Sequence, residues 1–246
     1  MRFFLFTVIL LFFALVIKAQ QNYSTKLNAS EVLESMKKLN VLGSVLYVAA
    51  HPDDENQRLI SYMASDRKMQ TAYLSLTRGD GGQNLIGSEL REMLGVLRTQ
   101  ELLAARSIDG GKQMFSRAND FGFSKTSAET LRFWNKKEVL SDVVWAIRKW
   151  QPDVIINRFS TDTTVETHGH HTSSAILSNE AFDLAADPNV FPEQLKYVSV
   201  WQPKRLFFNT SWFFYGSREA FDKSPKTNLV SADLGVYYPW KGKSNN

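Results

Sequence analysis

Apolar residues along this chain gather into short continuous runs, and segments with a different spacing separate them. Three such runs cover residues 45–50, 71–76 and 154–157. Each run is too short for a typical helix and carries few polar positions, as expected of a strand that is covered on both faces. The pattern therefore predicts three buried strands, and a later strand is expected over 206–209.

Between these runs, apolar residues recur every three or four positions, which is the spacing of one face of a helix. The predicted helices are one that starts at Asn28 and ends before Gly43, a short one after Asp54, and longer ones over 89–108 and 139–150. Strands that alternate with helices at such distances pair in parallel, with the helices as crossover connections. The sequence thus predicts an α/β, Rossmann-like doubly wound fold with a mostly parallel sheet and helices on both faces.

The N-terminus has the pattern of an export signal. Arg2 precedes the uncharged apolar stretch 3–17, and the small residue Ala19 follows at a suitable cleavage point. Such a stretch makes about 22 Å of helix, which is shorter than the roughly 30 Å hydrocarbon core of a membrane. We therefore expect residues 1–20 to be a signal peptide rather than an uncleaved anchor. The mature protein is then exported, periplasmic or extracellular, with no stable transmembrane span.

The remaining residues, 21–246, are expected to form a single domain. The pattern weakens after Tyr215, so the domain is expected to be incomplete at its C-terminal end. The chain has no cysteine, which excludes disulfides, a thiolate metal site and a cysteine nucleophile. The net charge is only +4, and two of these charges lie in the predicted signal peptide, so no nucleic-acid partner is expected.

The four histidines occupy two short segments. His51 directly follows the first predicted strand, and His168, His170 and His171 follow the third. Ligands of open parallel sheets bind beyond the carboxyl ends of the strands, near the point where the strand order reverses. The two histidine segments are therefore expected to meet over one crevice.

Imidazole and carboxylate are ligands that suit Zn²⁺, and a catalytic zinc has three protein ligands and one open position. His51 and Asp54 with one downstream histidine would make such a set. Asp53 then remains beside the metal as a general base, and His168 is a candidate acid or oxyanion donor. The competing interpretation is that Asp53 and Asp54 are a solvated helix N-terminus, favoured by the helix dipole.

Three motifs in a fixed order give a family resemblance. They are Ala50-His51-Pro52-Asp53-Asp54-Glu55, Arg98-x-x-Glu101 and His168-x-x-His171. Together they resemble the PIG-L/LmbE-like N-acetylglucosaminyl de-N-acetylase family, over roughly residues 43–210. The resemblance implies a Rossmann-like fold and a zinc-dependent hydrolysis that removes the N-acetyl group from an N-acetylglucosamine-type sugar or glycoconjugate.

By motif position, the resemblance also implies the roles of five residues. His51, Asp54 and His171 are the implied zinc ligands, Asp53 is the implied general base, and His168 is expected to support the tetrahedral intermediate. One Zn²⁺ per chain is expected, although other divalent transition metals suit the same donor atoms. The substrate, as the expected partner, is an N-acetylated sugar; the oligomeric state is not predicted.

Two further residues are candidate substrate contacts by resemblance. Arg98 is expected to contact sugar hydroxyls or an anionic group, but it can equally pair with Glu101 on one helix face. Asp120 falls where family members place an acid that contacts the sugar, but it can equally be an ordinary loop residue. The glycine-rich segment 79–84 follows the second strand and is either a plain turn or a substrate loop.

The sequence departs from the family pattern at two places. Gly169-His170 stands where the family commonly has Pro-Asp, so His170 competes with His171 as the third ligand. Glu166 occupies the position at which some members have a tyrosine that polarises the substrate carbonyl. Besides the metal-dependent deacetylase, we consider a non-catalytic carbohydrate-binding module derived from this fold. A metallophosphoesterase is a weaker alternative, because it would normally need a second metal.

Overall fold

The computed structural model describes residues 27–163 and 167–245 and divides the chain into two compact units, Met1–Lys37 and Lys38–Asn246. The predicted signal peptide and Glu166 lie outside the described residues. In the first unit, helix α2 (Ala29–Lys38) begins as predicted. The Asn28 side chain accepts from the Glu31 N–H at 2.9 Å, and the Glu31 carboxylate accepts from the Asn28 N–H at 2.8 Å. This reciprocal arrangement is a capping box.

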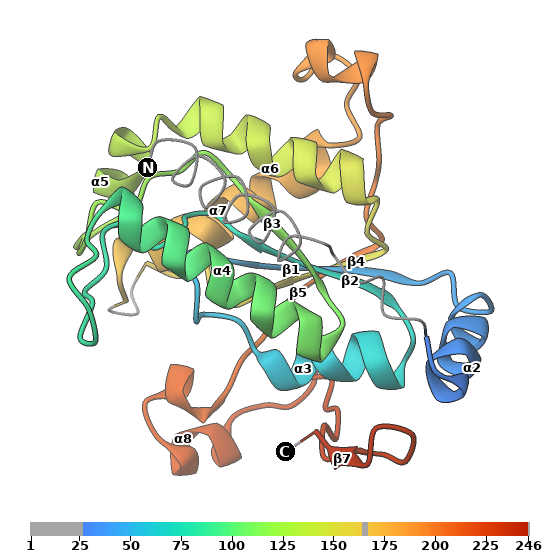
Figure 1. Cartoon of the computed structure of the whole chain (residues 1–246). Helices are drawn as coiled ribbons and strands as arrows, with labels where there is room; N and C mark the ends of the chain where they lie inside the picture. Colours follow the sequence, from blue (N-terminus) through green and yellow to red (C-terminus); the bar gives the residue numbers. More distant parts are fainter. Residues whose placement is uncertain (1–26, 164–166, 246) are drawn as a thin grey trace, which may run out of the picture. The chain divides into compact units, whose positions relative to one another are not determined.

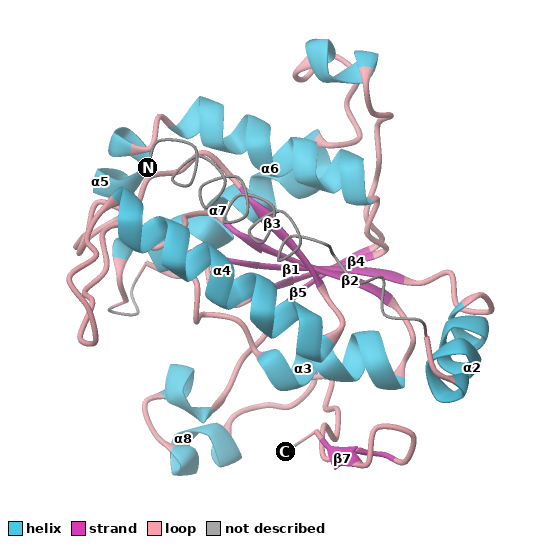
Figure 2. Cartoon of the chain, in the orientation of Figure 1, coloured by secondary structure: helices cyan, strands magenta, loops and turns pink. Residues whose placement is uncertain are grey.

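A five-stranded parallel sheet forms the centre of the second unit (Figure 2). Its strands are β1 (Ser44–Ala49), β2 (Gln70–Ser75), β3 (Lys112–Phe115), β4 (Val154–Asn157) and β5 (Arg205–Phe208). They lie in the order β3-β2-β1-β4-β5, and every pair is parallel. The predicted doubly wound α/β fold is therefore confirmed, and the strand order reverses between β1 and β4.

Helices cover both faces of this sheet (Figure 1). Alternate residues of β1 point to opposite faces, as the pleat of a strand requires. Val45 and Tyr47 pack with residues of α3 (Gln57–Ser61) and α4 (Glu92–Asp109), whereas Leu46 and Val48 pack with α6 (Lys136–Trp150) and α7 (Gly169–Leu184). A single turn of π-helix, η1 (Tyr62–Asp66), continues α3.

Two elements that shape the site were not predicted. Strand β3 has only four residues, and none of them is fully buried, so it leaves no apolar run in the sequence. Helix α7 is buried on several sides by small and polar residues such as Ser173, Ser174 and Ser178, which give no apolar periodicity. The spacing of apolar residues predicts only helices that bury one apolar stripe, and α7 has no such stripe.

The smaller elements complete the described chain. They are α5 (Ser127–Phe133), η2 (Pro192–Lys196), η3 (Trp212–Tyr215), α8 (Arg218–Lys223) and the antiparallel pair β6 (Tyr237–Tyr238) and β7 (Lys243–Ser244). None of the described helices is long and apolar enough to cross a lipid bilayer.

A buried arginine fastens the segment that connects α7 to β5. Arg148 on α6 is 1% exposed, and its guanidinium donates to the backbone carbonyls of Ala185, Asp187, Val190 and Phe191 and to the Gln194 side chain. Three of these carbonyls, those of Ala185, Asp187 and Phe191, also accept a backbone N–H, so Arg148 adds a second hydrogen bond to each of them. Arg148 therefore holds the chain that leads into β5.

Candidate active site

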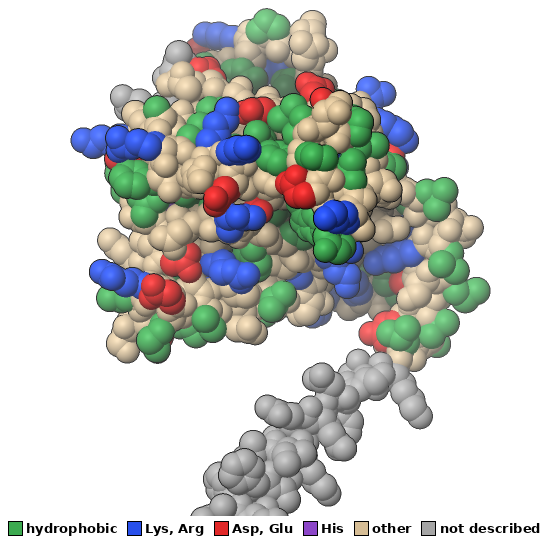
Figure 3. Space-filling model, turned by 90° about the horizontal axis from the view of Figure 1, so that it is seen from above, with side chains coloured by type: hydrophobic (Ala, Val, Ile, Leu, Met, Phe, Trp, Pro, Cys, Tyr) green, Lys and Arg blue, Asp and Glu red, His purple; other side chains and the backbone are tan. Residues whose placement is uncertain are grey.

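The two histidine segments meet at the carboxyl edge of the sheet, where the strand order reverses. His51–Asp54 leaves β1, and His168–His171 opens α7 after the adjacent strand β4. None of the four histidines is visible on the face drawn in Figure 3, where basic, acidic and hydrophobic side chains are interspersed. The meeting of these segments was expected from the fold rule for parallel sheets.

The donor atoms of His51, Asp54 and His171 face one another. His51 Nδ1 lies 3.2 Å from Asp54 Oδ2, and His171 Nε2 lies 3.4 Å from Asp54 Oδ1. One ligand atom from each of the three residues lies within 4.8 Å of the other two. Two imidazoles and a carboxylate at such distances fit a divalent transition metal of the zinc type.

Neighbouring groups hold each of these side chains in place. The Tyr73 hydroxyl donates a hydrogen bond to the His51 carbonyl. Asp54 Oδ2 accepts from the His51 N–H at 2.7 Å. The His171 ring stacks on Phe159, with 3.9 Å between ring centroids and 5° between the planes. These contacts fix the orientation of the three donors, as partners around metal ligands commonly do.

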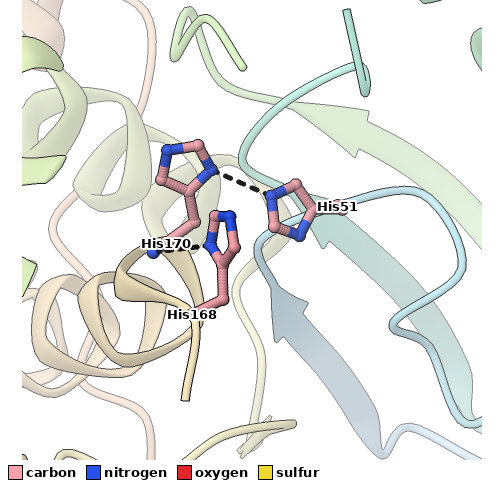
Figure 4. A group of neighbouring side chains, drawn as sticks. All are labelled: His51, His168 and His170. Atoms are coloured by element: carbon pink, nitrogen blue, oxygen red, sulfur yellow. Dashed lines mark hydrogen bonds between the residues drawn. The ribbon is translucent and has the colours of Figure 1, made fainter. Parts of the chain in front are cut away.

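His170, the alternative third ligand, faces Nε2 of His51, whereas Asp54 faces Nδ1. Figure 4 shows the His170 and His51 rings side by side. His170 is 0% exposed, and its Nδ1 is 2.9 Å from His51 Nε2. Its ring packs against Trp134 and Phe121, and its Nε2 has no hydrogen-bond partner among the described residues. With His51 and His168 it forms a second group with donor atoms within 4.8 Å of one another. His51 thus presents Nδ1 to Asp54 and Nε2 to His170.

His168 is the N-cap of α7. Its Nδ1 accepts from the His170 N–H at 3.1 Å, and the Ser124 N–H points at its Nε2 from 3.3 Å. A neutral imidazole has only one acceptor nitrogen, so these two bonds compete. We assign the acceptor to Nδ1, because that contact is shorter and satisfies a helix N-terminus. Nε2 then carries the proton and is a donor.

Asp53 is the most exposed carboxylate of this group, with 70% of its side chain accessible. Its φ of +92° is a strained value for a residue other than glycine. Arg98 donates to Asp53 Oδ2 at 2.9 Å and to the Pro52 carbonyl at 2.8 Å. Arg98 Nε also lies 2.9 Å from Glu101 Oε2, so the pairing alternative exists in the structure. The substrate-binding role of Arg98 stays a prediction.

A buried network that sequence reasoning missed supports Asp53. Glu55 Oε2 accepts from the Asp53 N–H at 2.9 Å. Glu55 Oε1 lies 3.3 Å from Arg106, which also binds Asp109 at 2.6 Å. The Glu55 and Arg106 side chains are 1% and 4% exposed. In the sequence, only the place of Glu55 at the end of the first motif pointed to this network. No sequence pattern indicated that Arg106 contacts Glu55 or that Asp109 contacts Arg106.

Asp120 lies beneath the site, 7% exposed. Its Oδ1 accepts from the Gly122 N–H at 2.9 Å, and its carboxylate oxygens lie 3.9 Å from His51 Nε2 and 3.8 Å from His170 Nδ1. The carboxylate therefore faces imidazoles, and the predicted contact with a sugar stays a prediction. Gly81 touches the same loop so closely that a Cβ there would lie 2.2 Å from the Gly122 nitrogen.

The electrostatics favour an ionised Asp54 and neutral imidazoles at His168, His170 and His171, but not at His51. Burial lowers the pKa of His171 to about 4 and that of His170 to about 2. Burial also lowers the pKa of His168. Burial is the largest effect on both His51 and Asp54 and opposes their charged forms, but the hydrogen bond between them together with the neighbouring charges outweighs it, so the pKa of His51 is raised and that of Asp54 is lowered. Deprotonated imidazoles and carboxylates are the forms that bind metals.

A cavity of about 350 Å³ opens over these groups. Its wall includes His51, Asp53, Arg98 and His171, and residues 79 and 81–83 of the glycine-rich segment contribute to it. This segment therefore lies at the site, where Gly81 permits a close approach to the loop of Asp120. The cavity is therefore lined by an exposed carboxylate, Asp53, by the guanidinium of Arg98 and by two of the three possible metal-binding residues, His51 and His171.

Comparison with protein families gives one match. The family model PIG-L, described as GlcNAc-PI de-N-acetylase, matches residues 46–182, which is more than half of the chain. The matched range contains every site residue discussed above. No curated protein sequence matches the chain significantly.

Solved structures share the fold. N,N'-diacetylchitobiose deacetylase from Pyrococcus horikoshii superposes with a TM-score of 0.53 at 20% identity, over 73% of this chain and 68% of that protein. The 4-carboxy-2-hydroxymuconate hydratase GalB from Pseudomonas putida KT2440 superposes with a TM-score of 0.50 at 19% identity. That match covers 67% of this chain and 64% of the hydratase, less than two thirds of its length. Because the two proteins are a deacetylase and a hydratase, the fold alone does not determine the reaction.

Proposed function

This chain belongs to the PIG-L family, described as GlcNAc-PI de-N-acetylase, and from this premise we propose that it removes the N-acetyl group from an N-acetylglucosamine-type sugar or glycoconjugate. The signal-peptide pattern of residues 1–20 supports a substrate outside the cytoplasm. The observation that carries the proposal is the convergence of His51, Asp54 and His171, from two distant segments, with donor atoms within 4.8 Å.

In this proposal His51, Asp54 and His171 hold one Zn²⁺. The position of His170 supports this choice of third ligand, because it is fully buried and faces His51 Nε2 rather than Asp54. When bound, such a metal acts as a Lewis acid and lowers the pKa of water. His170 would instead orient His51 by accepting a hydrogen bond from its Nε2–H, as partners behind metal-bound imidazoles commonly do.

The chain's own residues supply the proton transfers. The Asp53 carboxylate accepts a proton from the attacking water, whose oxygen bonds to the acetyl carbon. The Nε2–H of His168 donates a hydrogen bond to the carbonyl oxygen as negative charge develops there. The C–N bond then breaks, the proton passes to the amine nitrogen, and acetate and a free amino sugar leave. Arg98 keeps the Asp53 carboxylate oriented through their 2.9 Å hydrogen bond.

The test is acetate release from a panel of N-acetylated sugars, with and without a chelator. We expect release that a chelator abolishes and added zinc restores. Asp53→Asn should retain the metal and lose turnover, because an amide cannot accept the proton. Asp142→Asn is the matched control, since Asp142 pairs with Arg117 at 2.9 Å and does not line the cavity. Full activity of Asp53→Asn would refute the base, and sugar binding without any acetate release would favour the binding-module alternative.

A further inference from the structure

We propose that helix α4 is the interface between two copies of this chain, whose α4 helices pack antiparallel across a two-fold axis. The helix is the long green ribbon that runs along one face of the sheet in Figure 1. Its outer side carries uncharged residues that are exposed in the described chain. These residues are arranged symmetrically about the middle of the helix, and a symmetric surface fits a second copy of itself.

The outer side of α4 is more apolar than the side that it buries. Successive helical residues are about 100° apart, so positions three, four and seven apart share a side. The buried side contains two leucines, but also the ion pair of Arg106 with Asp109 at 2.6 Å. A surface helix normally turns its apolar stripe inward, so an exposed stripe indicates an interaction site. We call the exposed side the α4 stripe, and its large apolar members are between 41% and 77% exposed: Met93, Val96, Leu97, Leu103 and Ile108.

The α4 stripe is symmetric about Gln100, which stands at the middle of the helix. In an antiparallel pair centred there, each residue faces the one that lies equally far beyond Gln100 in the other copy. Val96 then meets Ala104 of the partner subunit, and Leu97 meets Leu103 of the partner subunit. A large side chain opposite a small one lets two helices approach closely, and the facing leucines fill the space beside them.

The remaining members of the α4 stripe, Gln100, Ala104 and Ser107, tolerate burial. The Ser107 hydroxyl donates to the Ala104 carbonyl at 2.6 Å, so it keeps a partner when the stripe is covered. At the axis the Gln100 amide can pair with the same amide of the other copy, because an amide both donates and accepts. No member of the stripe is charged, so association need not remove a charge from water.

The residues beside the α4 stripe favour a protein partner over a lipid surface. Glu92 and Glu101 flank it, one on each side. Helices that lie on membranes carry lysine and arginine beside their apolar face, where these cations attract anionic lipids. The basic residue next to Glu101 in space, Arg98, already pairs with Glu101 and Asp53, both at 2.9 Å. Two copies packed through the stripe leave these charged groups in water.

The size of the α4 stripe indicates a reversible dimer. Burial of one large aliphatic side chain removes roughly 60–120 Å² of apolar surface from water. The five apolar residues are a little more than half exposed on average, so each copy offers roughly 170–350 Å². Homodimer interfaces are about 65% apolar, which gives roughly 500–1,100 Å² over both copies. Stable dimers bury about 1,200–2,000 Å², so we expect a dissociation constant of about 10–100 µM.

Sedimentation velocity of the purified protein tests for the dimer. Between about 1 and 300 µM, the average mass should rise from that of one chain toward that of two. Val96→Glu should raise the dissociation constant at least about tenfold, because each copy then places a carboxylate against Ala104 of the partner subunit. Val96 is 62% exposed and glutamate is a good helix former, so this variant should keep its fold and its Tm.

Charge pairing across the axis tests the register. In the double variant Val96→Glu/Ala104→Lys, each introduced carboxylate faces an introduced ammonium of the other copy, so the dissociation constant should return to within about threefold of the unaltered value. Ala104→Glu alone should weaken the dimer as Val96→Glu does, and it is the second single variant. Weakening by both single variants without recovery in the double variant would overturn the antiparallel pairing.

Val230→Glu is the matched control. Val230 is 79% exposed and lies outside α4, so the same substitution there should leave the dissociation constant unchanged. A protein that stays monomeric over the whole concentration range contradicts the proposal, and so does equal weakening by Val230→Glu. Binding of the monomer to anionic phosphatidylglycerol vesicles that is lost in Val96→Glu would assign the stripe to a membrane instead.

Discussion

Removal of Glu55 should impair catalysis without removing the metal. Glu55 contributes no atom to the donor set, but its Oε2 accepts the Asp53 N–H at 2.9 Å and so fixes a backbone with φ of +92°. A positive φ at a residue other than glycine costs about 1–3 kcal/mol and persists only where the surroundings enforce it. In Glu55→Ala that restraint is gone, and Asp53 can relax away from the position of a base.

The expected fall in kcat of Glu55→Ala follows from the strength of the hydrogen bond between the Asp53 N–H and the Glu55 carboxylate. A hydrogen bond to a charged group contributes about 1.5–3 kcal/mol, which corresponds to roughly a 10- to 150-fold change in an equilibrium constant. We therefore expect kcat of Glu55→Ala to fall by about 10- to 100-fold. Glu55→Gln keeps an oxygen for the Asp53 N–H but loses the ion pair with Arg106, so its loss should be smaller.

The assay is acetate release at saturating substrate, with zinc content and thermal denaturation measured on the same preparations. Glu138→Gln is the control, because Glu138 is an exposed glutamate of α6 that pairs with Arg117 at 3.5 Å. A folded, zinc-loaded Glu55→Ala that retains the kcat of the unaltered protein would show that Glu55 does not position Asp53. A kcat that falls only in proportion to lost zinc would show the same.

Further predictions concern stability. Arg148→Lys should lower the free energy of unfolding in urea by about 2–4 kcal/mol, because an ammonium cannot reach all the acceptors that the guanidinium binds; a loss below about 0.5 kcal/mol would contradict this. Zinc at a hundredfold excess over its dissociation constant should stabilise the protein by about 2.7 kcal/mol and raise Tm, and Asp54→Ala should abolish that rise; an undiminished rise in Asp54→Ala would count against Asp54 as a ligand. The hydrogen bond from Lys204, aided by Ser44, lowers the pKa of Asp153 in the folded protein. The ionised Asp153 carboxylate therefore stabilises the fold above its ordinary pKa of 3.8, and this stabilisation is lost as the pH falls through the lower pKa of the folded state. Asp153→Asn should thus be less stable by about 0.5–1 kcal/mol at pH 7, and the difference should vanish in strong acid; a difference that grows in acid would reverse the sign of this argument.

The sheet and the meeting of the histidines were predictable because both follow from local patterns and one topological rule. The runs 45–50 and 154–157 became β1 and β4 almost residue for residue, since continuously apolar segments are what a sheet covered on both faces requires. Parallel pairing then brings both carboxyl ends to one edge. His51 and His171 could therefore be placed together without knowledge of any loop conformation.

Other features depend on tertiary contacts that leave no periodic signal. The burial of His170 against Trp134 follows from which way α7 turns at His168, and α7 itself has no apolar stripe. Asp53, with its positive φ, donates its N–H to Glu55, and Glu55 pairs with Arg106 of α4. Such constraints appear only once the elements are packed.

The most direct test of the central claim is anomalous X-ray diffraction at the zinc edge from crystals of the zinc-loaded protein. We expect a single peak within bonding distance of His51, Asp54 and His171, with His170 behind His51 and not bound to the ion. A peak coordinated by His168 and His170, or its absence between Asp54 and His171, would contradict it.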